Sequence, residues 1–247
     1  MRKLRLAIAG LTACSGCQLS LLNCEDELPL LLAQFEFHFF PMACSPALLE
    51  GEYDAAIVEG CLSMPHEINL LQELRSRSRY LIALGTCAVC GGVAALRNGE
   101  ERELLCQKVY GESQVASETF EPLSLHRVVK VDASVTGCPP EKVELLRLLA
   151  GLTRGALPDE VDYPVCAECR MRENLCLLME RDMLCLGPLT LGGCSARCPS
   201  LSVPCEACRG PVPEANLAEA LEVYVQKGFD RQDVIGRLRR FCPEWKI

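Results

Sequence analysis

Short apolar runs recur along the N-terminal part of the chain and are separated by stretches with helical spacing. Continuous runs lie at residues 4–10, 54–59, 80–84 and 128–131, each bounded by turn or polar residues. Such runs are typical of parallel strands that are buried on both faces. The segment 35–40 reads F-E-F-H-F-F and alternates apolar with polar residues, which indicates an edge strand.

Helical patterns alternate with these strands. They cover residues 18–27, 64–77 and 141–152. Pro29 stops or restarts the first pattern, because proline cannot donate a helix hydrogen bond. The third pattern opens after two prolines and places Val143, Leu146 and Leu149 on one face. Alternating strands and helices predict an α/β domain with a doubly wound, flavodoxin-like parallel sheet.

The pattern changes near residue 158. Residues 166–208 have weak helical periodicity, many glycines and prolines, and eight cysteines. A segment of this kind buries little core, so its folding energy is expected to come from metal ligation. Residues 214–240 then carry two amphipathic helical patterns. We therefore predict two domains, 1–157 and 158–247, the second being an irregular cysteine-rich module with C-terminal helices.

Composition and charge narrow the classes of protein. There are 33 acidic and 25 basic residues, a formal net charge of −8, which argues against a nucleic-acid partner. No run of apolar residues is long enough to predict a transmembrane segment. The start resembles a lipoprotein signal, but Arg5 interrupts its short apolar run, which also fits a first strand. We expect a cytoplasmic protein whose 18 cysteines stay reduced, which disfavours a disulfide framework.

Cysteines follow several of the predicted strands. Cys14 and Cys17 follow the first strand, Cys61 the third, Cys87 the fourth and Cys138 the fifth. The carboxyl ends of parallel strands meet at one edge of a sheet, so four thiolates from three loops can converge there on one cubane cluster. Neighbouring glycines allow close backbone approach. Cys61 is better explained as a small buried side chain.

The eight cysteines of the second domain have the spacing C-x2-C-x6-C-x8-C-x8-C-x3-C-x6-C-x2-C. Eight thiolates suit two zinc sites, which commonly use paired C-x2-C knuckles. They also suit two 4Fe–4S clusters, which the spacing favours over zinc. Spacing alone leaves both possibilities open.

Three motifs in residues 4–153 resemble the small, electron-transferring subunit of nickel–iron hydrogenases. They are C-S-G-C, G-T-C-A-x-x-G-G and G-C-P-P, and a related complex I subunit shares part of the pattern. The resemblance implies a proximal 4Fe–4S cluster. Its ligands, here called the proximal set, would be Cys14, Cys17, Cys87 and Cys138.

The segments P-V-C-A-E-C, L-G-G-C-S-A-R-C-P-S and P-C-E-A-C-R-G-P resemble cytoplasmic hydrogenases. The most similar group is the methyl-viologen-reducing, heterodisulfide-reductase-linked type, with sulfhydrogenases as near relatives. By order along the chain, the resemblance implies a distal set of Cys166, Cys169, Cys176 and Cys185 and a medial set of Cys194, Cys198, Cys205 and Cys208. Cys166 stands where periplasmic relatives have histidine, and Cys198 where they often have proline, which favours three all-cysteine 4Fe–4S clusters.

The resemblance implies an oxidoreductase subunit without a catalytic centre of its own. It would relay electrons between a nickel–iron large subunit and an iron–sulfur or flavin partner, such as a heterodisulfide-reductase-like or diaphorase-like protein. Two alternatives stay open: a wire in a related oxidoreductase whose large subunit lacks nickel, and a zinc-binding or thiol-rich interaction scaffold. Six cysteines are unassigned, and Cys90 among them is the alternative proximal ligand. The six are Cys24, Cys44, Cys61, Cys90, Cys106 and Cys242.

Overall fold

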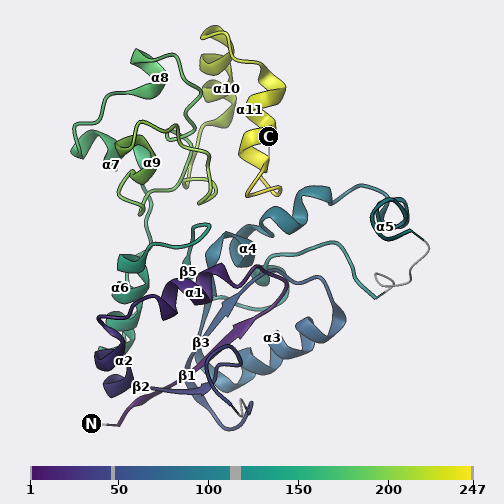
Figure 1. The fold of residues 1–247 in the computed structure, drawn as a ribbon, viewed down its shortest axis with the longest axis vertical. Coiled ribbons are helices and arrows are strands. Elements are labelled where there is room, and N and C mark those ends of the chain that lie inside the picture. The colour runs from purple at the N-terminus through teal and green to yellow at the C-terminus, as the bar shows by residue number, and fades with distance from the viewer. Residues whose placement is uncertain (1, 46–47, 112–117, 246–247) are drawn as a thin grey trace.

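Five parallel strands form a single sheet in the N-terminal part of the molecule. The computed structural model describes residues 2–45, 48–111 and 118–245 (Figure 1). The strands are β1 (Leu4–Gly10), β2 (Phe35–Phe39), β3 (Tyr53–Glu59), β4 (Ser78–Leu84) and β5 (Ala133–Val135). Their order in the sheet is β2-β1-β3-β4-β5, the order of a flavodoxin-like doubly wound sheet. The predicted fold class is therefore confirmed, with β2 at an edge.

Helices cover both faces of this sheet and connect its strands. Those of the N-terminal part are α1 (Gly16–Leu22), α2 (Leu28–Gln34), α3 (Pro65–Arg77), α4 (Gly85–Cys90), α5 (Arg102–Tyr110) and α6 (Lys142–Thr153). Pro29 lies in the first turn of α2, so it restarts the helical path after α1. Short 3₁₀ helices lie at Val93–Arg97 and Leu125–Arg127. Figure 1 shows α1, α2 and α6 on one side of the sheet and α3 on the other.

The alternation of side chains along each strand fills two separate cores. Leu6 and Ile8 of β1 belong to the core on the α1, α2 and α6 side. Ala7 and Ala9 belong to the core on the α3 side, where small side chains let the helix approach the sheet. In α6, the buried positions are Leu145, Leu148, Leu149 and Leu152. The prediction that Val143 shares the apolar face of this helix was wrong, because its side chain is 65% exposed.

The predicted strand at Val128–Val131 was also wrong. The last strand is instead Ala133–Val135, which pairs with Ile82–Leu84 of β4. The backbone N–H of Leu81 donates to the Asp132 carboxylate at 2.8 Å, so a side chain rather than a strand carbonyl occupies the ladder position before β5. Regular pairing therefore begins only at residue 133.

Residues 158–245, here called the second domain after the prediction, pack their helices and loops beyond the carboxyl end of the sheet (Figure 1). Its helices are α7 (Val165–Met171), α8 (Leu177–Glu180), α9 (Arg197–Ser200), α10 (Leu217–Gln226) and α11 (Arg231–Arg239). Tyr224, Val234 and Leu238 of the last two helices pack against several cysteines in a third core. The two C-terminal helices predicted within 214–240 are thus confirmed. Among the helices described, none is both long and apolar enough to cross a membrane.

Asp132 makes the stability of this sheet edge depend on pH. Burial raises the pKa of Asp132, but the Leu81 N–H and the Arg75 guanidinium outweigh burial and hold this pKa below its usual value. A carboxylate with a depressed pKa stabilises the fold above its unfolded-state pKa of about 3.9, and this contribution is lost as the pH falls below that value. Below about pH 4, we expect the free energy of unfolding to fall less steeply with pH in Asp132→Asn than in the wild type. Denaturant titrations over that range, with the exposed Asp159→Asn as control, would contradict this if both variants kept the wild-type slope.

Candidate metal centres

The proximal set gathers at the carboxyl edge of the sheet. Cys14 and Cys17 follow β1, Cys87 lies in α4 directly after β4, and Cys138 follows β5. Burial and the neighbouring Cys138 and Cys14 thiols together raise the pKa of Cys87 to about 11. Burial also raises the pKa of Cys17, with contributions from Glu59, Cys87 and Cys138. The structure thus brings together all four cysteines, although β3 separates β1 from β4.

Glycines make room for this set. A Cβ on Gly85 would overlap the sulfur of Cys17, and one on Gly92 would overlap the sulfur of Cys87. Both glycines have positive φ, 83° and 62°, where other residues are strained. The backbone can therefore approach the thiols only because these two positions lack side chains.

A buried carboxylate lies beside the proximal set. Glu59, the last residue of β3, is 1% exposed and accepts hydrogen bonds from the Cys17 N–H and the Gln18 side-chain amide, both at 2.9 Å. It fixes the start of α1, which carries Cys17. The sequence signal that could have found Glu59 is an acidic residue closing an otherwise apolar strand.

The distal set gathers in the cysteine-rich module. Cys166 and Cys169 lie on α7, Cys176 precedes α8, and Cys185 lies in the segment after α8. Burial and the neighbouring thiols of Cys185, Cys169 and Cys176 together raise the pKa of Cys166 to about 12. The hydroxyl of the buried Tyr224 donates to the Cys185 carbonyl at 2.8 Å, so α10 holds this loop in place.

The medial set lines a cavity. All four of its cysteines, together with Cys138 of the proximal set, border a space of about 490 Å³ between the two domains. Burial and the neighbouring Cys194 and Cys198 thiols raise the pKa of Cys208 to about 11. Cys205 lies between the medial and distal sets: its N–H is 3.3 Å from the Cys185 sulfur, while its side chain lines the cavity.

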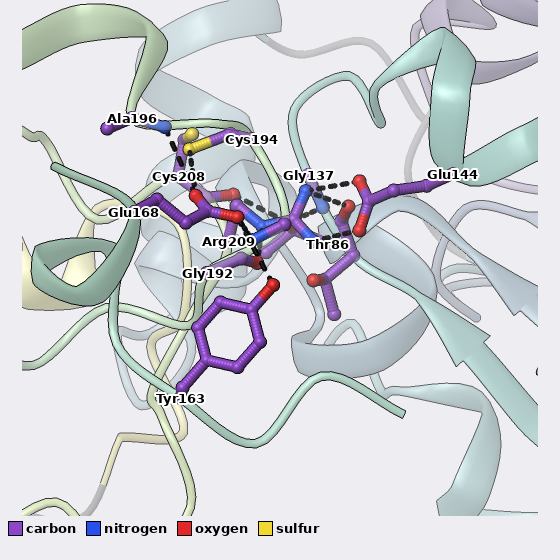
Figure 2. Close-up of polar contacts among 12 residues, drawn as sticks. Thr86, Gly137, Glu144, Tyr163, Glu168, Gly192, Cys194, Ala196, Cys208 and Arg209 are labelled. Carbon is purple, nitrogen blue, oxygen red and sulfur yellow. Dashed lines mark hydrogen bonds and ion pairs between the residues drawn. The ribbon is translucent and has the colours of Figure 1, made fainter. Parts of the chain in front are cut away.

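Thr86 joins the proximal and medial loops by hydrogen bonds. Its hydroxyl donates to the Cys208 carbonyl at 2.6 Å and accepts from the Gly137 N–H at 3.0 Å (Figure 2). Thr86 precedes Cys87 and Gly137 precedes Cys138, so one hydroxyl connects two proximal positions to a medial one. The position of Thr86 in the sequence gave no sign of this role.

Arg209 is the main polar link between the domains. Its guanidinium is 2% exposed and forms a two-pronged ion pair with Glu144 of α6, at 2.6 and 2.8 Å. It also donates to the carbonyls of Thr136 at 2.9 Å and Gly192 at 2.6 Å (Figure 2). Burial raises the pKa of Glu144, whereas the guanidinium lowers it. The residue after Cys208 is thus fixed to both domains.

Glu168 connects α7, which carries two cysteines of the distal set, to the loop that carries Cys194 of the medial set. Its carboxylate accepts from the Gly193 N–H at 2.8 Å and the Ala196 N–H at 3.1 Å, and lies 3.9 Å from the Cys194 sulfur (Figure 2). Ala196 has a left-handed backbone with φ of 50°, which this bond helps to hold. Because Glu168 lies between Cys166 and Cys169 on α7, the two sets share one rigid support.

The unassigned cysteines have local partners of their own. Cys24, Cys44 and Cys61 each donate a thiol hydrogen bond to a backbone carbonyl, at 3.5, 3.6 and 3.4 Å. Cys61 is fully buried, which fits the packing role expected for it. Cys90, the alternative proximal ligand, lies near Cys242 beside Gly210.

The donor chemistry fits iron–sulfur clusters. All 18 cysteines lie within the described residues and are free thiols. Ten of the twelve thiols in the three groups are partly or fully buried, Cys14 and Cys138 are exposed, and one group borders a cavity. Within residues 2–45, 48–111 and 118–245, no three His, Cys, Asp or Glu side chains lie close enough to share one metal ion. In a cubane, the four cysteines bind four different irons.

Removing the Thr86 hydroxyl should loosen the contact between the proximal and medial loops. Thr86→Val leaves the Gly137 N–H and the Cys208 carbonyl without this partner, which costs roughly 1–3 kcal/mol per buried unpaired group. We expect a lower free energy of unfolding for Thr86→Val and near wild-type stability for Thr86→Ser, measured by denaturant titration. Equal stability of valine and serine variants would show that the hydroxyl does not bind the loops together.

Comparison with known proteins identifies relatives along nearly the whole chain. The family model for the NADH ubiquinone oxidoreductase 20 kDa subunit matches residues 14–152. Sulfhydrogenase 2 subunit delta of Pyrococcus furiosus is 37% identical over 240 residues, covering 97% of this chain and 99% of the relative. One subunit of the F420-non-reducing hydrogenase vhu of Methanocaldococcus jannaschii is 31% identical over 270 residues, covering 96% of this chain and 94% of the relative.

Solved structures show the same architecture. A chain of the NAD⁺-reducing [NiFe]-hydrogenase in the H2-reduced state superposes with a TM-score of 0.56 and 30% identity, covering 64% of this chain and 95% of that one. A chain of the actinobacterial-type NiFe-hydrogenase from Ralstonia eutropha H16 has a TM-score of 0.60, covering 100% and 94%. The latter is 15% identical, so it supports the fold alone.

Proposed function

Since this chain belongs to the family of the NADH ubiquinone oxidoreductase 20 kDa subunit and the small subunits of nickel–iron hydrogenases, we propose that it conducts electrons through three 4Fe–4S clusters. It is an electron-transfer subunit of an oxidoreductase complex of the hydrogenase type. The proposal adds the number of clusters, their ligands and the route between them. The proximal, medial and distal sets would each hold one cluster.

The observation that carries this proposal is the cavity between the domains. Four cysteines, Cys194, Cys198, Cys205 and Cys208, border it, and Cys138 of the proximal set borders the same space. The distal set lies on the other side of Cys205. This arrangement supports a middle cluster between two outer ones. When bound, a 4Fe–4S cluster accepts and gives up one electron, at a potential that its surroundings set.

The side chains around the cysteines would position the ligands and tune the clusters. The Thr86 hydroxyl holds the Cys208 loop against Gly137, and Glu168 holds the Cys194 loop against α7. Buried Glu59 places negative charge beside the proximal set, and partly buried Glu168 places negative charge beside the medial set. Negative charge disfavours the further negative charge of a reduced cluster, so both carboxylates would lower the potentials there. Arg209 is neutralised by Glu144, so it acts mainly as a support.

We propose that the proximal set faces a large subunit. Cys14 and Cys138 are exposed at the carboxyl edge of the sheet, where a partner can cover them. The large subunit would hold a nickel–iron centre, and electrons from hydrogen would enter at the proximal set and leave at the distal set. The acceptor would be an iron–sulfur or flavin protein that feeds disulfide or nicotinamide reduction. We place the complex in the cytoplasm, where the 18 cysteines of this chain would stay reduced.

Isolation of the native complex tests the partner. We expect anaerobic co-purification of a nickel-containing large subunit, and hydrogen-dependent reduction of methyl viologen by that complex. A large subunit without nickel and without this activity would favour the alternative of a related, nickel-free oxidoreductase. Neither outcome depends on the number of clusters in this chain.

A further inference from the structure

Two cysteines outside all three sets lie against each other in the interior. Cys90 ends α4 and is 6% exposed, and Cys242 follows α11 and is 3% exposed. The Cys242 thiol lies close enough to Cys90 to raise the pKa of the Cys90 thiol. They come from different domains, so their contact is a tertiary feature that local sequence does not impose.

Gly210 marks where the two sulfurs converge. A Cβ built on this glycine would lie 3.1 Å from the Cys90 sulfur and 3.8 Å from the Cys242 sulfur. Gly210 has φ of 76°, and the loop passes close to the thiols because it carries no side chain there. A disulfide requires a sulfur–sulfur distance of about 2.05 Å, and both sulfurs already lie close to this one point.

The pair is also reachable by small molecules. Both cysteines line a cavity of about 580 Å³ at the domain junction, together with Arg209, Glu244 and Trp245. Buried structural thiols are usually inert, both because reagents cannot reach them and because their pKa is raised, as the neighbouring Cys242 and burial raise the pKa of Cys90. Here the cavity borders both residues, so a reagent as small as a peroxide can reach the pair.

We propose that Cys90 and Cys242 form a peroxide-reactive dithiol that closes to a disulfide between α4 and the C-terminal segment. In the first step, one sulfur attacks the O–O bond of hydrogen peroxide, becoming a sulfenic acid and releasing one water. The second thiol then attacks the sulfenic sulfur, forming the S–S bond and expelling a second water. Two thiols and one peroxide thus give one disulfide and two waters, with two electrons moving from sulfur to oxygen.

The disulfide would crosslink two parts of the proposed electron path. Helix α4 also carries Cys87 of the proximal set, and Gly210 lies two residues after Cys208 of the medial set. The bond is a modification site next to the clusters but uses none of their ligands. Its formation therefore does not depend on whether the proposed clusters are correct.

Peptide mapping of the full chain tests this directly. Trypsin places Cys90 in residues 80–97, which also hold Cys87, and Cys242 in residues 241–246. The anaerobically purified protein is treated with a small excess of hydrogen peroxide, blocked with N-ethylmaleimide and digested without reductant. Iron content is followed in parallel. The variants are Cys90→Ser and Cys242→Ser, with Cys106→Ser on α5 as matched control.

We expect a linked peptide 80–97/241–246 in the wild type and in Cys106→Ser that dithiothreitol separates. It should fall to background in Cys90→Ser and in Cys242→Ser. Persistence of the link in Cys90→Ser would assign it to Cys87 and overturn the proposal. Absence of the linked peptide from the wild type, or its appearance only after iron has been released, would overturn it as well. A linked peptide in a chain that holds no iron would support the dithiol and reject the proposed clusters.

Discussion

Replacing Cys208 with alanine should remove about four of roughly twelve irons from the chain and leave the other two clusters in place. Cys208 borders the cavity between the domains, and its thiol is surrounded by Cys194 and Cys198. Changes in the surroundings of a metal site cost roughly 10–100-fold in affinity or activity, so loss of a ligand should reach at least the top of that range. Hydrogen-dependent reduction of the native acceptor by the complex should fall accordingly.

The matched control for this variant is Cys106→Ala. Cys106 is a half-buried cysteine on α5 and belongs to none of the three sets. It should retain all iron and full electron transfer. If Cys208→Ala also kept all its iron and its rate, the medial set would be wrong. Iron loss from all three sites would instead show that the module folds only as a unit, which near-ultraviolet circular dichroism can check.

Replacing Arg209 with methionine should cost about 3–5 kcal/mol of unfolding free energy, because Glu144 is left charged and unpaired in the interior. The same change removes the hydrogen bonds to the carbonyls of Thr136 and Gly192. The double variant Arg209→Met with Glu144→Met should recover much of the loss, since burying two apolar side chains avoids the unpaired charge. Denaturant titration of all three proteins at one pH measures the difference.

Arg231→Met serves as the control for Arg209→Met. Arg231 pairs with Glu222 at 3.0 Å, but both side chains are at least half exposed, and such pairs contribute little. No measurable change is expected there. A loss for Arg209→Met as small as that of Arg231→Met would contradict the role of Arg209 as the link between domains.

The sequence predicted the sheet well because its signals are local. Continuous apolar runs marked β1, β3 and β4, and the alternating run marked β2 as an edge. The strand β5 was missed because Ala133–Val135 is short and includes a polar Ser134, whereas the more apolar Val128–Val131 lacks strand partners. Pairing with β4 determines where the last strand lies, and no local sequence pattern indicates that pairing. Val143 was misplaced for a similar reason, since the face of α6 that is buried depends on how the helix packs.

The positions of the cysteines were also predictable, because each proximal cysteine follows a strand whose end is fixed by the sheet. The residues that join the sets were not. Thr86 and Cys208 are 122 positions apart, and Arg209 and Glu144 are 65 apart, so their contacts depend on how the two domains pack. The pairing of Cys90 with Cys242 depends on the same packing. The spacing of the cysteines indicates which thiols can come together, but not which polar groups hold their loops in place.

The central claim is that this chain holds three 4Fe–4S clusters, and metal and sulfide analysis of the anaerobically purified chain tests it most directly. Three cubanes predict about twelve irons and about twelve acid-labile sulfides per chain. Zinc without sulfide would contradict the claim and support a zinc-binding scaffold. A chain that is fully folded with neither metal nor sulfide would also contradict the claim.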